Sequence, residues 1–300
     1  MISFISNLSL KKGYGIILLT SEQVKGGVFN CFTKDISTAV HDVLKSERFE
    51  GSKGEVFPVV IGKDAVVLLG LGKEKDLSLT SLRGLVRSVL LSAFFKKASD
   101  IEILPHTSSF EVVSAIIEAK IIGTYAWKKY ISRKKDDKTI DNKTIHIVAD
   151  KDVRHNQVIK AAEASNLTRN LVNENADVTT AEYLADITRG LVKGSRHIDL
   201  EVLDRAKLKT KKFGLLLAVN KGSSQEPRVV VVRYNGGKKN EPYTAIIGKG
   251  LTFDSGGLNL KPSGSMETMR SDMSGAAAVI GTLKATLDLK IKKNVIFAFG

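Results

Sequence analysis

The segment GKGLTFDSGGLNLKPSGSMETMRSDMSGAAA, residues 248–278, follows the apolar run YTAIIG, residues 243–248, and leads into the helical pattern MSGAAAVIGTLKATLDL, residues 273–289. It holds four charged side chains in a loop rich in glycine, serine and threonine: Lys249, Asp254, Lys261 and Asp272. A strand, a glycine-rich loop and a helix in this order indicate an α/β layer fold. In such folds ligands bind beyond the carboxyl ends of the strands, where this loop begins. The segment therefore predicts the fold class and a site at one edge of the sheet.

Strand-like and helix-like segments alternate through the rest of the chain. Apolar runs predict strands at 15–20, 56–62, 65–72, 101–105, 144–149, 214–219 (GLLLAV), 228–234 and 294–300. Helical periodicity predicts helices at 36–46, 79–97, 110–127, 158–173 and 179–194. Continuous Val, Ile and Leu runs are typical of strands buried on both faces of a mixed or parallel sheet that helices cover. The last strand is of this interior type and no closing element follows it, so the sequence looks cut there.

A polar segment, KKYISRKKDDKTIDNKT, residues 128–144, separates the two halves of the chain. Linkers between domains are usually polar and exposed, and 300 residues suit two ordinary domains. We therefore predict a smaller N-terminal α/β domain, residues 1–150, and a C-terminal domain, residues 151–300, which carries the charged loop and whose mixed sheet is covered by helices.

The composition, 43% hydrophobic and 26% charged, is that of a folded globular protein. The net charge of +14 leaves nucleic acid open as a secondary possibility, but solvated helix ends and linkers are the favoured explanation of basic runs such as KLKTKK, residues 207–212. No helix-turn-helix, zinc-finger or RNA-binding motif supports nucleic acid. The single cysteine, Cys31, excludes an intramolecular disulfide, and no apolar run reaches the roughly 18 residues of a membrane span. These features predict a cytoplasmic location with no membrane partner.

The residue types of the 248–278 loop allow several kinds of chemistry. Carboxylate oxygens suit Mg²⁺ or Mn²⁺ and, with nitrogen, Zn²⁺, whereas a lysine ligates a metal only as the neutral amine. Lys249 fits that second role beside a cation, and Lys261 fits a charged group that stabilises an oxyanion. The alternatives remain open at this point: DSGG is a turn signal, Asp272 suits a helix cap, and loop lysines are usually solvated. The phosphate-binding G-x-x-x-x-G-K-[ST] pattern is absent, and none of the five histidines has metal-ligand spacing.

The loop resembles the M17 leucyl aminopeptidase family, whose motif it reproduces from GKGLTFDSGG through LKPSGSMETMRSDMSGAAA. The resemblance extends to LLLAVNKGSSQEPRVVVVRYNG and, more weakly, to FEGSKGEV and VVLLGLGKEKDLSLTSLRG. It implies that Lys249, Asp254 and Asp272 ligate two divalent ions, Mn or Zn, with Asp254 bridging them. It also implies that Lys261 is the catalytic lysine. Met269 falls where the family lines the pocket for the substrate's first side chain; an ordinary core methionine is the alternative.

The function implied by the resemblance is a metal-dependent aminopeptidase that releases N-terminal residues, leucine favoured, from peptides. The family assembles as a homohexamer. The alternative from another class is a basic nucleic-acid-binding or scaffold protein that retains the peptidase fold.

Three departures from the family pattern are visible. The chain has NENAD at 173–177 where the family usually has Asn-x-Pro-x-Asn, and Ser274 where it usually has glycine. The family's second motif, Asn-Thr-Asp-Ala-Glu-Gly-Arg, occurs nowhere in the sequence. That motif supplies two more carboxylate ligands and an arginine that holds a bicarbonate, and it is expected some tens of residues past Gly300. We therefore expect residues 1–300 alone to be catalytically inactive.

Overall fold

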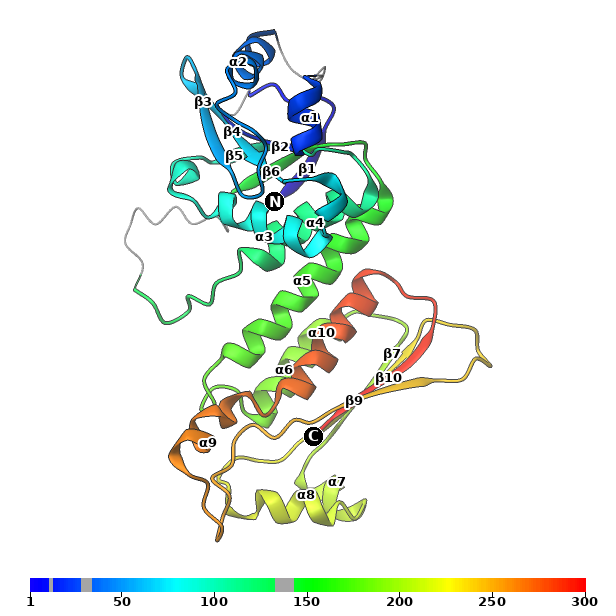
Figure 1. Cartoon of the computed structure of the whole chain (residues 1–300). Helices are drawn as coiled ribbons and strands as arrows, with labels where there is room; N and C mark the ends of the chain where they lie inside the picture. The colour runs from blue at the N-terminus through cyan, green and yellow to red at the C-terminus, as the bar shows by residue number, and fades with distance from the viewer. Residues whose placement is uncertain (11–12, 28–33, 133–142) are drawn as a thin grey trace. The chain divides into compact units, whose positions relative to one another are not determined.

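The computed structural model describes residues 1–10, 13–27, 34–132 and 143–300 (Figure 1). Cys31 and the centre of the polar segment 128–144 lie outside these ranges. The chain divides into two compact units, Met1–Ala162 and Glu163–Gly300. The division falls inside helix α5 (Val153–Asn173), and each unit is described by itself below. No helix in the described ranges combines the length and apolar character needed to cross a bilayer.

Unit 1 is built on a six-stranded sheet with the strand order β1-β6-β5-β2-β4-β3. The strands are β1 (Ile2–Ile5), β2 (Tyr14–Leu19), β3 (Val56–Ile61), β4 (Asp64–Gly70), β5 (Asp100–Leu104) and β6 (Thr144–Val148). Adjacent strands pair in parallel except β3, which pairs antiparallel with β4. The main helices of this unit are α1 (Ser21–Gly26), α2 (Lys34–Lys45), α3 (Leu79–Leu90) and α4 (Phe110–Glu118).

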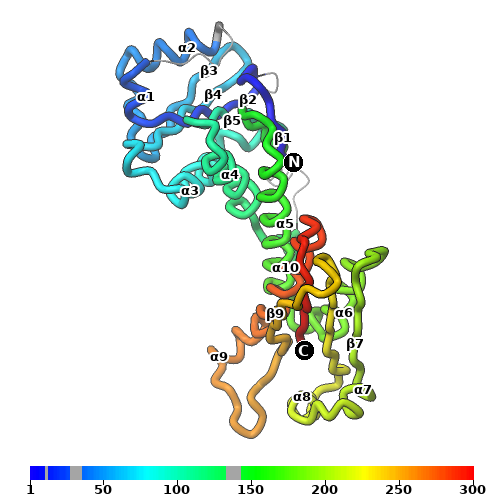
Figure 2. The backbone as a smooth tube through the Cα atoms, turned by 90° about the vertical axis from the view of Figure 1, so that its right-hand side faces the viewer, coloured from blue at the N-terminus to red at the C-terminus, as the bar shows by residue number. Residues whose placement is uncertain are grey.

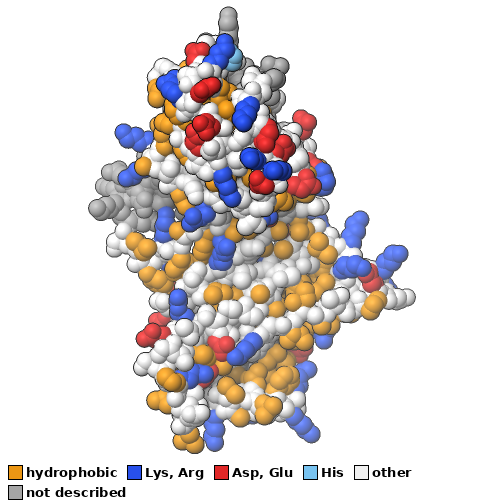
Figure 3. Space-filling view, viewed as in Figure 1, with side chains coloured by type: hydrophobic (Ala, Val, Ile, Leu, Met, Phe, Trp, Pro, Cys, Tyr) orange, Lys and Arg blue, Asp and Glu red, His pale blue; other side chains and the backbone are white. Residues whose placement is uncertain are grey.

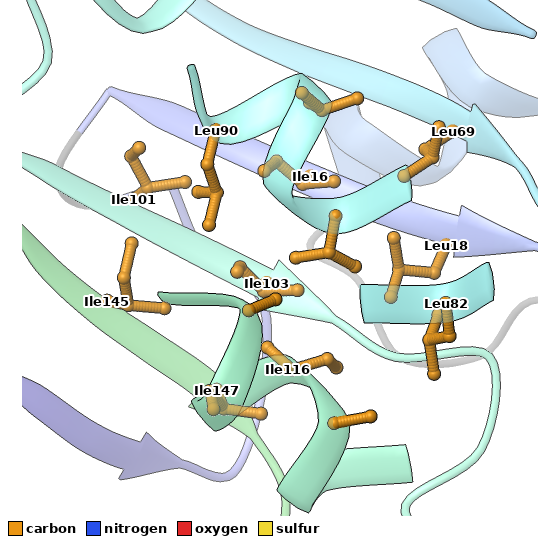
Figure 4. Packing of buried hydrophobic residues seen from close by; sticks show 14 of the residues in the cluster. Ile16, Leu18, Leu69, Leu82, Leu90, Ile101, Ile103, Ile116, Ile145 and Ile147 are labelled. Atoms are coloured by element: carbon orange, nitrogen blue, oxygen red, sulfur yellow. The ribbon is translucent and has the colours of Figure 1, made fainter. Parts of the chain in front are cut away.

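The central strands of unit 1 are buried on both faces. Because side chains alternate along a strand, Ile16 and Leu18 of β2 enter one core, with α3 and α4, while Ile17 and Leu19 enter the other, with α2. Figure 4 shows the first core, in which Ile16 and Leu18 lie among side chains from the neighbouring strands and helices. The central strands are therefore apolar along their whole length because both of their faces are buried, as the sequence indicates.

Unit 2 is built on a four-stranded mixed sheet with the order β7-β8-β10-β9. The strands are β7 (Ile198–Leu203), β8 (Val229–Asn235), β9 (Thr244–Gly248) and β10 (Asn294–Phe299). β8 pairs antiparallel with β7 and β10, whereas β10 pairs in parallel with β9. Helix α10 (Ser274–Asp288) connects β9 to β10 and shares a core with α6 (Ala181–Val192) and the end of α5. The strand, loop and helix order predicted around residues 248–278 is therefore confirmed as a parallel βαβ unit.

Two sequence predictions for unit 2 are wrong. Residues 214–219 form helix α8 (Gly214–Val219) rather than a buried strand, and its Leu215 is 89% exposed. Leucine and alanine favour helices, and a six-residue apolar run has too short a pattern to separate helix from strand. Strand β9 is not buried on both faces, because it forms the edge of the sheet and leaves Ile247 76% exposed.

Several other elements differ from the sequence expectation in extent or were not expected. The helix predicted over 79–97 ends at Leu90, and the one predicted over 110–127 passes at Ala119 into a single π-helical turn. The short elements without a clear sequence signal are β1, β7, α1, α7 (Arg205–Thr210) and α9 (Ser263–Glu267). The three helices in this group have five or six residues each, and the two strands have four and six, so their periodicity is too brief to recognise.

Candidate functional site

The charged loop of unit 2 begins where two parallel strands end. Gly248 of β9 pairs with Phe299 of β10, so both carboxyl ends meet at one edge of the sheet. Just beyond them, the amide of Gly250 donates a hydrogen bond of 3.1 Å to the carbonyl of Gly300. Ligands of open α/β sheets bind in this position, and Lys249 is the first residue past the edge.

Helix α10 approaches the end of β9 backbone to backbone. The amide of Ala276 donates to the carbonyl of Lys249 at 2.8 Å. A Cβ atom on Gly275 would lie 2.6 Å from the amide nitrogen of Lys249, and one on Gly248 would lie 2.2 Å from the carbonyl oxygen of Gly275. Glycine at both positions is therefore required for the close approach, which fixes the backbone of Lys249 against the start of α10.

The first ion pair of the site joins the strand end to the turn before α10. Lys249 Nζ donates to Asp272 Oδ2 at 2.7 Å, and the Asp272 side chain is 27% exposed. The N-cap residue of α10 is Met273, and no side chain caps this helix. The geometry thus gives Asp272 an ionic partner rather than the helix-capping role that the sequence left open.

The second ion pair lies within the glycine-rich loop. Lys261 Nζ is 3.4 Å from Asp254 Oδ1, which also accepts a 2.8 Å hydrogen bond from the amide of Gly256. The amide of Lys261 donates to the carbonyl of Ser255 at 2.9 Å and closes the loop. Gly256, at φ +95°, adopts a conformation that side chains disfavour, so the DSGG sequence forms a tight turn that aims Asp254 at Lys261.

Two cavities, each of about 570 Å³, meet at Asp254. The first, here called the loop cavity, is lined by Asp254, Gly256, Asn259, Leu260, Lys261, Pro262, Ser265 and Met269. The second, here called the α8 cavity, contains Lys249 and Asp254 together with residues of α8 and the segment before β8. Met269 is only 9% exposed and lines the loop cavity, so it takes part in both the packing and the cavity wall.

The donor set of the site fits a divalent cation, although no group of three or more His, Cys, Asp and Glu side chains in the described ranges could hold one. Asp254 and Asp272 are partly buried carboxylates, each opposed by a lysine ammonium. Two carboxylates with an amine nitrogen form a set of ligands that Mn²⁺ and Zn²⁺ accept. A cation bound at either carboxylate would supply the positive charge that the lysine ammonium supplies in the ion pair.

The wall of the α8 cavity contains residues that the sequence did not single out. Leu216 and Val219 come from α8, and Arg228 comes from the segment before β8. Arg228 forms an ion pair with Glu182, and the hydrogen bonds from Arg189 and Arg228 lower the pKa of the Glu182 carboxyl. The available signal was the stretch LLLAVNKGSSQEPR, residues 215–228, which shares the family resemblance, although the sequence does not indicate which of its residues line a cavity.

The fold and the charged loop define a two-domain α/β protein with a candidate site at the carboxyl edge of the unit 2 sheet, and comparison with known proteins gives the family. A model of the N-terminal domain of the cytosol aminopeptidase family matches residues 18–134, and a model of its catalytic domain matches residues 166–300. The chain belongs to the cytosol aminopeptidase family, M17.

Individual relatives agree with this assignment. A probable cytosol aminopeptidase of Protochlamydia amoebophila is 35% identical over 271 residues, which is 87% of this chain and 54% of the relative. One of Alkaliphilus metalliredigens is 32% identical over 304 residues, which is 95% of this chain and 60% of the relative. The chain thus spans little more than half the length of these curated relatives.

Solved structures share the architecture. A tomato leucine aminopeptidase mutant superposes with a TM-score of 0.77 at 23% identity, covering 100% of this chain and 62% of that one. The bottromycin maturation enzyme BotP in complex with Mn superposes with a TM-score of 0.74 at 26% identity, covering 96% of this chain and 59% of that one. The predicted two-domain α/β architecture with a mixed C-terminal sheet is confirmed.

Proposed function

We propose that Lys249, Asp254, Lys261 and Asp272 form one part of the catalytic centre of a metal-dependent aminopeptidase of the leucyl aminopeptidase type. Its substrates are peptides in the cytoplasm, from which it releases N-terminal residues, with leucine favoured. The observation that carries the proposal is the pairing of Lys249 with Asp272 and of Lys261 with Asp254 at the joint carboxyl edge of β9 and β10. Relatives named cytosol aminopeptidase support it.

Lys249, Asp254 and Asp272 are the residues that would hold two divalent cations, Mn²⁺ or Zn²⁺, with Asp254 shared between them. The shared role of Asp254 is what the family resemblance implies for its place in the motif. When bound, the ions lower the pKa of water and place positive charge beside the scissile carbonyl. The manganese complex of BotP supports the use of a divalent metal.

Lys261 acts on the substrate through its charge. Its ammonium, oriented by Asp254, would donate a hydrogen bond to the oxygen of the scissile carbonyl and stabilise the negative charge that develops there. Met269 would contact the first side chain of the peptide from the wall of the loop cavity, since a flexible thioether adapts to aliphatic side chains.

The 300 residues contain three of the five protein ligands that the family resemblance implies, and they lack the arginine that holds bicarbonate. We therefore expect residues 1–300 to bind Mn²⁺ weakly and to leave leucinamide uncleaved. A longer chain containing an Asn-Thr-Asp-Ala-Glu-Gly-Arg segment would complete the site, and by family resemblance it would assemble as a homohexamer.

The test compares release of leucine from leucinamide by residues 1–300 and by the longer chain, each with Mn²⁺, with Zn²⁺ and after chelation. Metal-dependent release by the longer chain alone is the expected result. If the longer chain binds metal but releases no leucine, the proposed activity is wrong. Hydrolysis by residues 1–300 would show that the missing ligands are dispensable.

A further inference from the structure

Three polar side chains of unit 1 form a hydrogen-bonded row across neighbouring strands. Ser3 Oγ lies 2.6 Å from His146 Nδ1, and His146 Nε2 lies 3.0 Å from Asp100 Oδ1. They come from β1, β6 and β5, which are adjacent in the sheet. Ser3 pairs in register with His146, and Asp100 pairs with Thr144, two residues earlier on β6, so all three project from the same face. The three residues, here called the unit 1 triad, thus place a hydroxyl, an imidazole and a carboxylate in the order of a nucleophile, its base and the group that orients the base.

The hydrogen bonds of the unit 1 triad determine where its protons lie. A carboxylate only accepts hydrogen bonds, so the neutral His146 ring carries its proton on Nε2 and donates it to Asp100. Nδ1 is then the acceptor, and the Ser3 hydroxyl donates to it. The Asp100 carboxylate is itself held in place, because the hydroxyl of Ser99 donates to its other oxygen at 2.7 Å. The lone pair of His146 is therefore placed to take the proton of Ser3, as the activation of a serine nucleophile requires.

A second carboxylate lies beside the imidazole. Glu102 on β5 pairs in register with His146 and is 3% exposed. It accepts hydrogen bonds from the amides of Ser9 and Leu10 at 2.8 and 3.1 Å, which leaves Asp100 as the partner of Nε2. Both carboxylates stabilise the imidazolium that forms when His146 takes a proton, because they place negative charge close to it.

The unit 1 triad is partly open to solvent. β1 is an edge strand of the sheet, and Figure 2 shows it at the margin of unit 1, on the side away from α1. Ser3 is partly exposed, and the side chains of His146 and Asp100 are 17% and 20% exposed. A small molecule can therefore reach the hydroxyl without a rearrangement of the core.

The free edge of β1 directs a backbone donor past the nucleophile. The amide of Ala149 donates to the carbonyl of Ile5 at 3.2 Å, so the backbone of Ile5 faces β6. Alternate residues of a strand face the same neighbour, so the amide of Phe4 points toward the open edge instead. Phe4 directly follows Ser3. Its amide is thus placed to donate a hydrogen bond to an oxyanion that forms beside Ser3 Oγ.

The surroundings of Ser3 favour an uncharged acyl group. Ile5 and Val148 pair in register two residues farther along β1 and β6, on the same face as Ser3. Val148 is buried in the core that contains α2, whereas Ile5 is only partly buried and offers apolar surface beside the hydroxyl. Figure 3 shows acidic and basic side chains interspersed on the visible face of unit 1, so that face has no field of a single sign to attract a charged ligand.

We propose that the unit 1 triad is a second catalytic site, which hydrolyses esters of short, uncharged acyl groups. Ser3 is its nucleophile, His146 its general base and Asp100 its positioning residue. The reaction needs these side chains and water alone. The site belongs to unit 1, so it does not depend on the aminopeptidase activity proposed for the charged loop of unit 2.

The reaction has two steps, and each one uses His146 Nδ1 as the carrier of one proton. First, Ser3 Oγ bonds to the acyl carbon while its proton passes to Nδ1; the ester C–O bond breaks, and the leaving alkoxide takes that proton. Second, a water molecule gives a proton to Nδ1 and its oxygen bonds to the acyl carbon. The bond from the acyl carbon to Oγ then breaks, and Ser3 recovers the proton from Nδ1. The products are a carboxylic acid and an alcohol.

The test measures the reactivity of Ser3 directly. A fluorophosphonate forms an Oγ–P bond with an activated serine and releases fluoride. Residues 1–300 are labelled with it in the presence of a metal chelator, and peptide mass spectrometry gives the rate at each serine. Ser88 on α3 is the internal reference, because it is exposed and its hydroxyl donates to the carbonyl of Gly84 at 2.9 Å rather than to an imidazole. We expect Ser3 to react about 100-fold faster than Ser88 or more, the factor that a general base contributes.

Substitution of the base and of its partner gives the matched comparison. His146→Gln and Asp100→Asn should each lower the rate at Ser3 by about 100-fold, whereas Asp76→Asn, at an exposed carboxylate, should not change it. Thermal unfolding followed by the fluorescence of Trp127 shows whether unit 1 of each variant is folded.

Turnover is measured with 4-nitrophenyl butyrate as the release of 4-nitrophenolate. Ser3→Ala should lose the sustained release, and Ser88→Ala should keep it. The acylation of lysines by this ester contributes equally in both variants, so their difference reports the unit 1 triad.

Three results would overturn the proposal. The first is equal labelling of Ser3 and Ser88 in the unmodified chain. The second is fast labelling of Ser3 that persists in folded His146→Gln and Asp100→Asn variants, because the base would then be another group. The third is equal release of 4-nitrophenolate by the unmodified chain and by Ser3→Ala. None of them bears on the aminopeptidase proposal.

Discussion

Replacement of Gly275 by alanine should separate helix α10 from strand β9. The added Cβ would lie 2.6 Å from the amide nitrogen and 3.0 Å from the carbonyl oxygen of Lys249, and both contacts are with backbone that cannot rotate away. The helix or the strand end must move by several tenths of an ångström, which strains the hydrogen bond from Ala276 to Lys249. Overpacking of this kind costs about 1–3 kcal/mol of unfolding free energy.

The expected effect on thermal unfolding is confined to unit 2. For a unit of this size, a loss of 1 kcal/mol lowers the melting temperature by roughly 3–5 °C, so the variant should melt at least about 3 °C lower. Circular dichroism reports both units, whereas the fluorescence of Trp127, the one tryptophan, reports unit 1 alone. The transition seen by Trp127 should stay in place.

Gly190→Ala provides the control, because Gly190 lies in helix α6 of the same unit and a Cβ there meets nothing within 4 Å. That substitution should stabilise unit 2 by about 0.5–1 kcal/mol through the lower entropy of the unfolded chain. Two results would contradict the prediction: a melting temperature of Gly275→Ala within a degree of that of the unmodified protein, or a change of melting temperature in the same direction for both variants. Either result would show that the close approach of α10 to β9 does not fix the backbone of Lys249.

Three further predictions concern charge. In the longer chain with the full ligand set, Lys261→Ala should lower kcat by about 100-fold or more with little change in KM, and an unchanged kcat would exclude oxyanion stabilisation by this residue. Asp254→Asn should remove most Mn²⁺ binding in a titration calorimeter, whereas Asp288→Asn, at the far end of α10, should not; equal affinities would contradict the shared-ligand role. Burial lowers the pKa of His155, which is stacked between two phenyl rings with both ring nitrogens lacking a partner in the described structure. The unfolded chain then binds more protons than the folded one as pH falls below about 6.5, so unit 1 should lose stability on acidification. His155→Phe should flatten that decline when Trp127 fluorescence follows unfolding between pH 7 and 5; a decline of unchanged slope would exclude His155 as its source.

The strands of the fold were predictable wherever the apolar run belongs to a central strand. The β2 run places successive side chains in two separate cores, so its continuous hydrophobicity has one structural explanation. The run at 214–219 is also apolar but is rich in leucine and alanine, which favour helices, and it forms α8, of which only Leu216 and Leu217 pack against a core. The sequence also gives no sign that β9 is an edge strand, since edge position depends on which strands pair and not on the strand itself.

The candidate site was predictable as a set of residues and not as an arrangement. The residue types and glycine spacing of 248–278 are local, and local turn chemistry decides that Asp254 faces Lys261 across the DSGG turn. The pairing of Lys249 with Asp272 depends on the parallel alignment of β9 with β10 and on the contact of Gly248 with Gly275. Side-chain periodicity and turn preference act over a few residues, so the sequence by itself determined the α/β class and the four charged groups. Packing between distant segments decided which of these charged groups pair with each other, and it also formed the α8 cavity. The position of a helix next to a strand end depends on contacts with other segments, and the sequence of the strand does not specify those contacts.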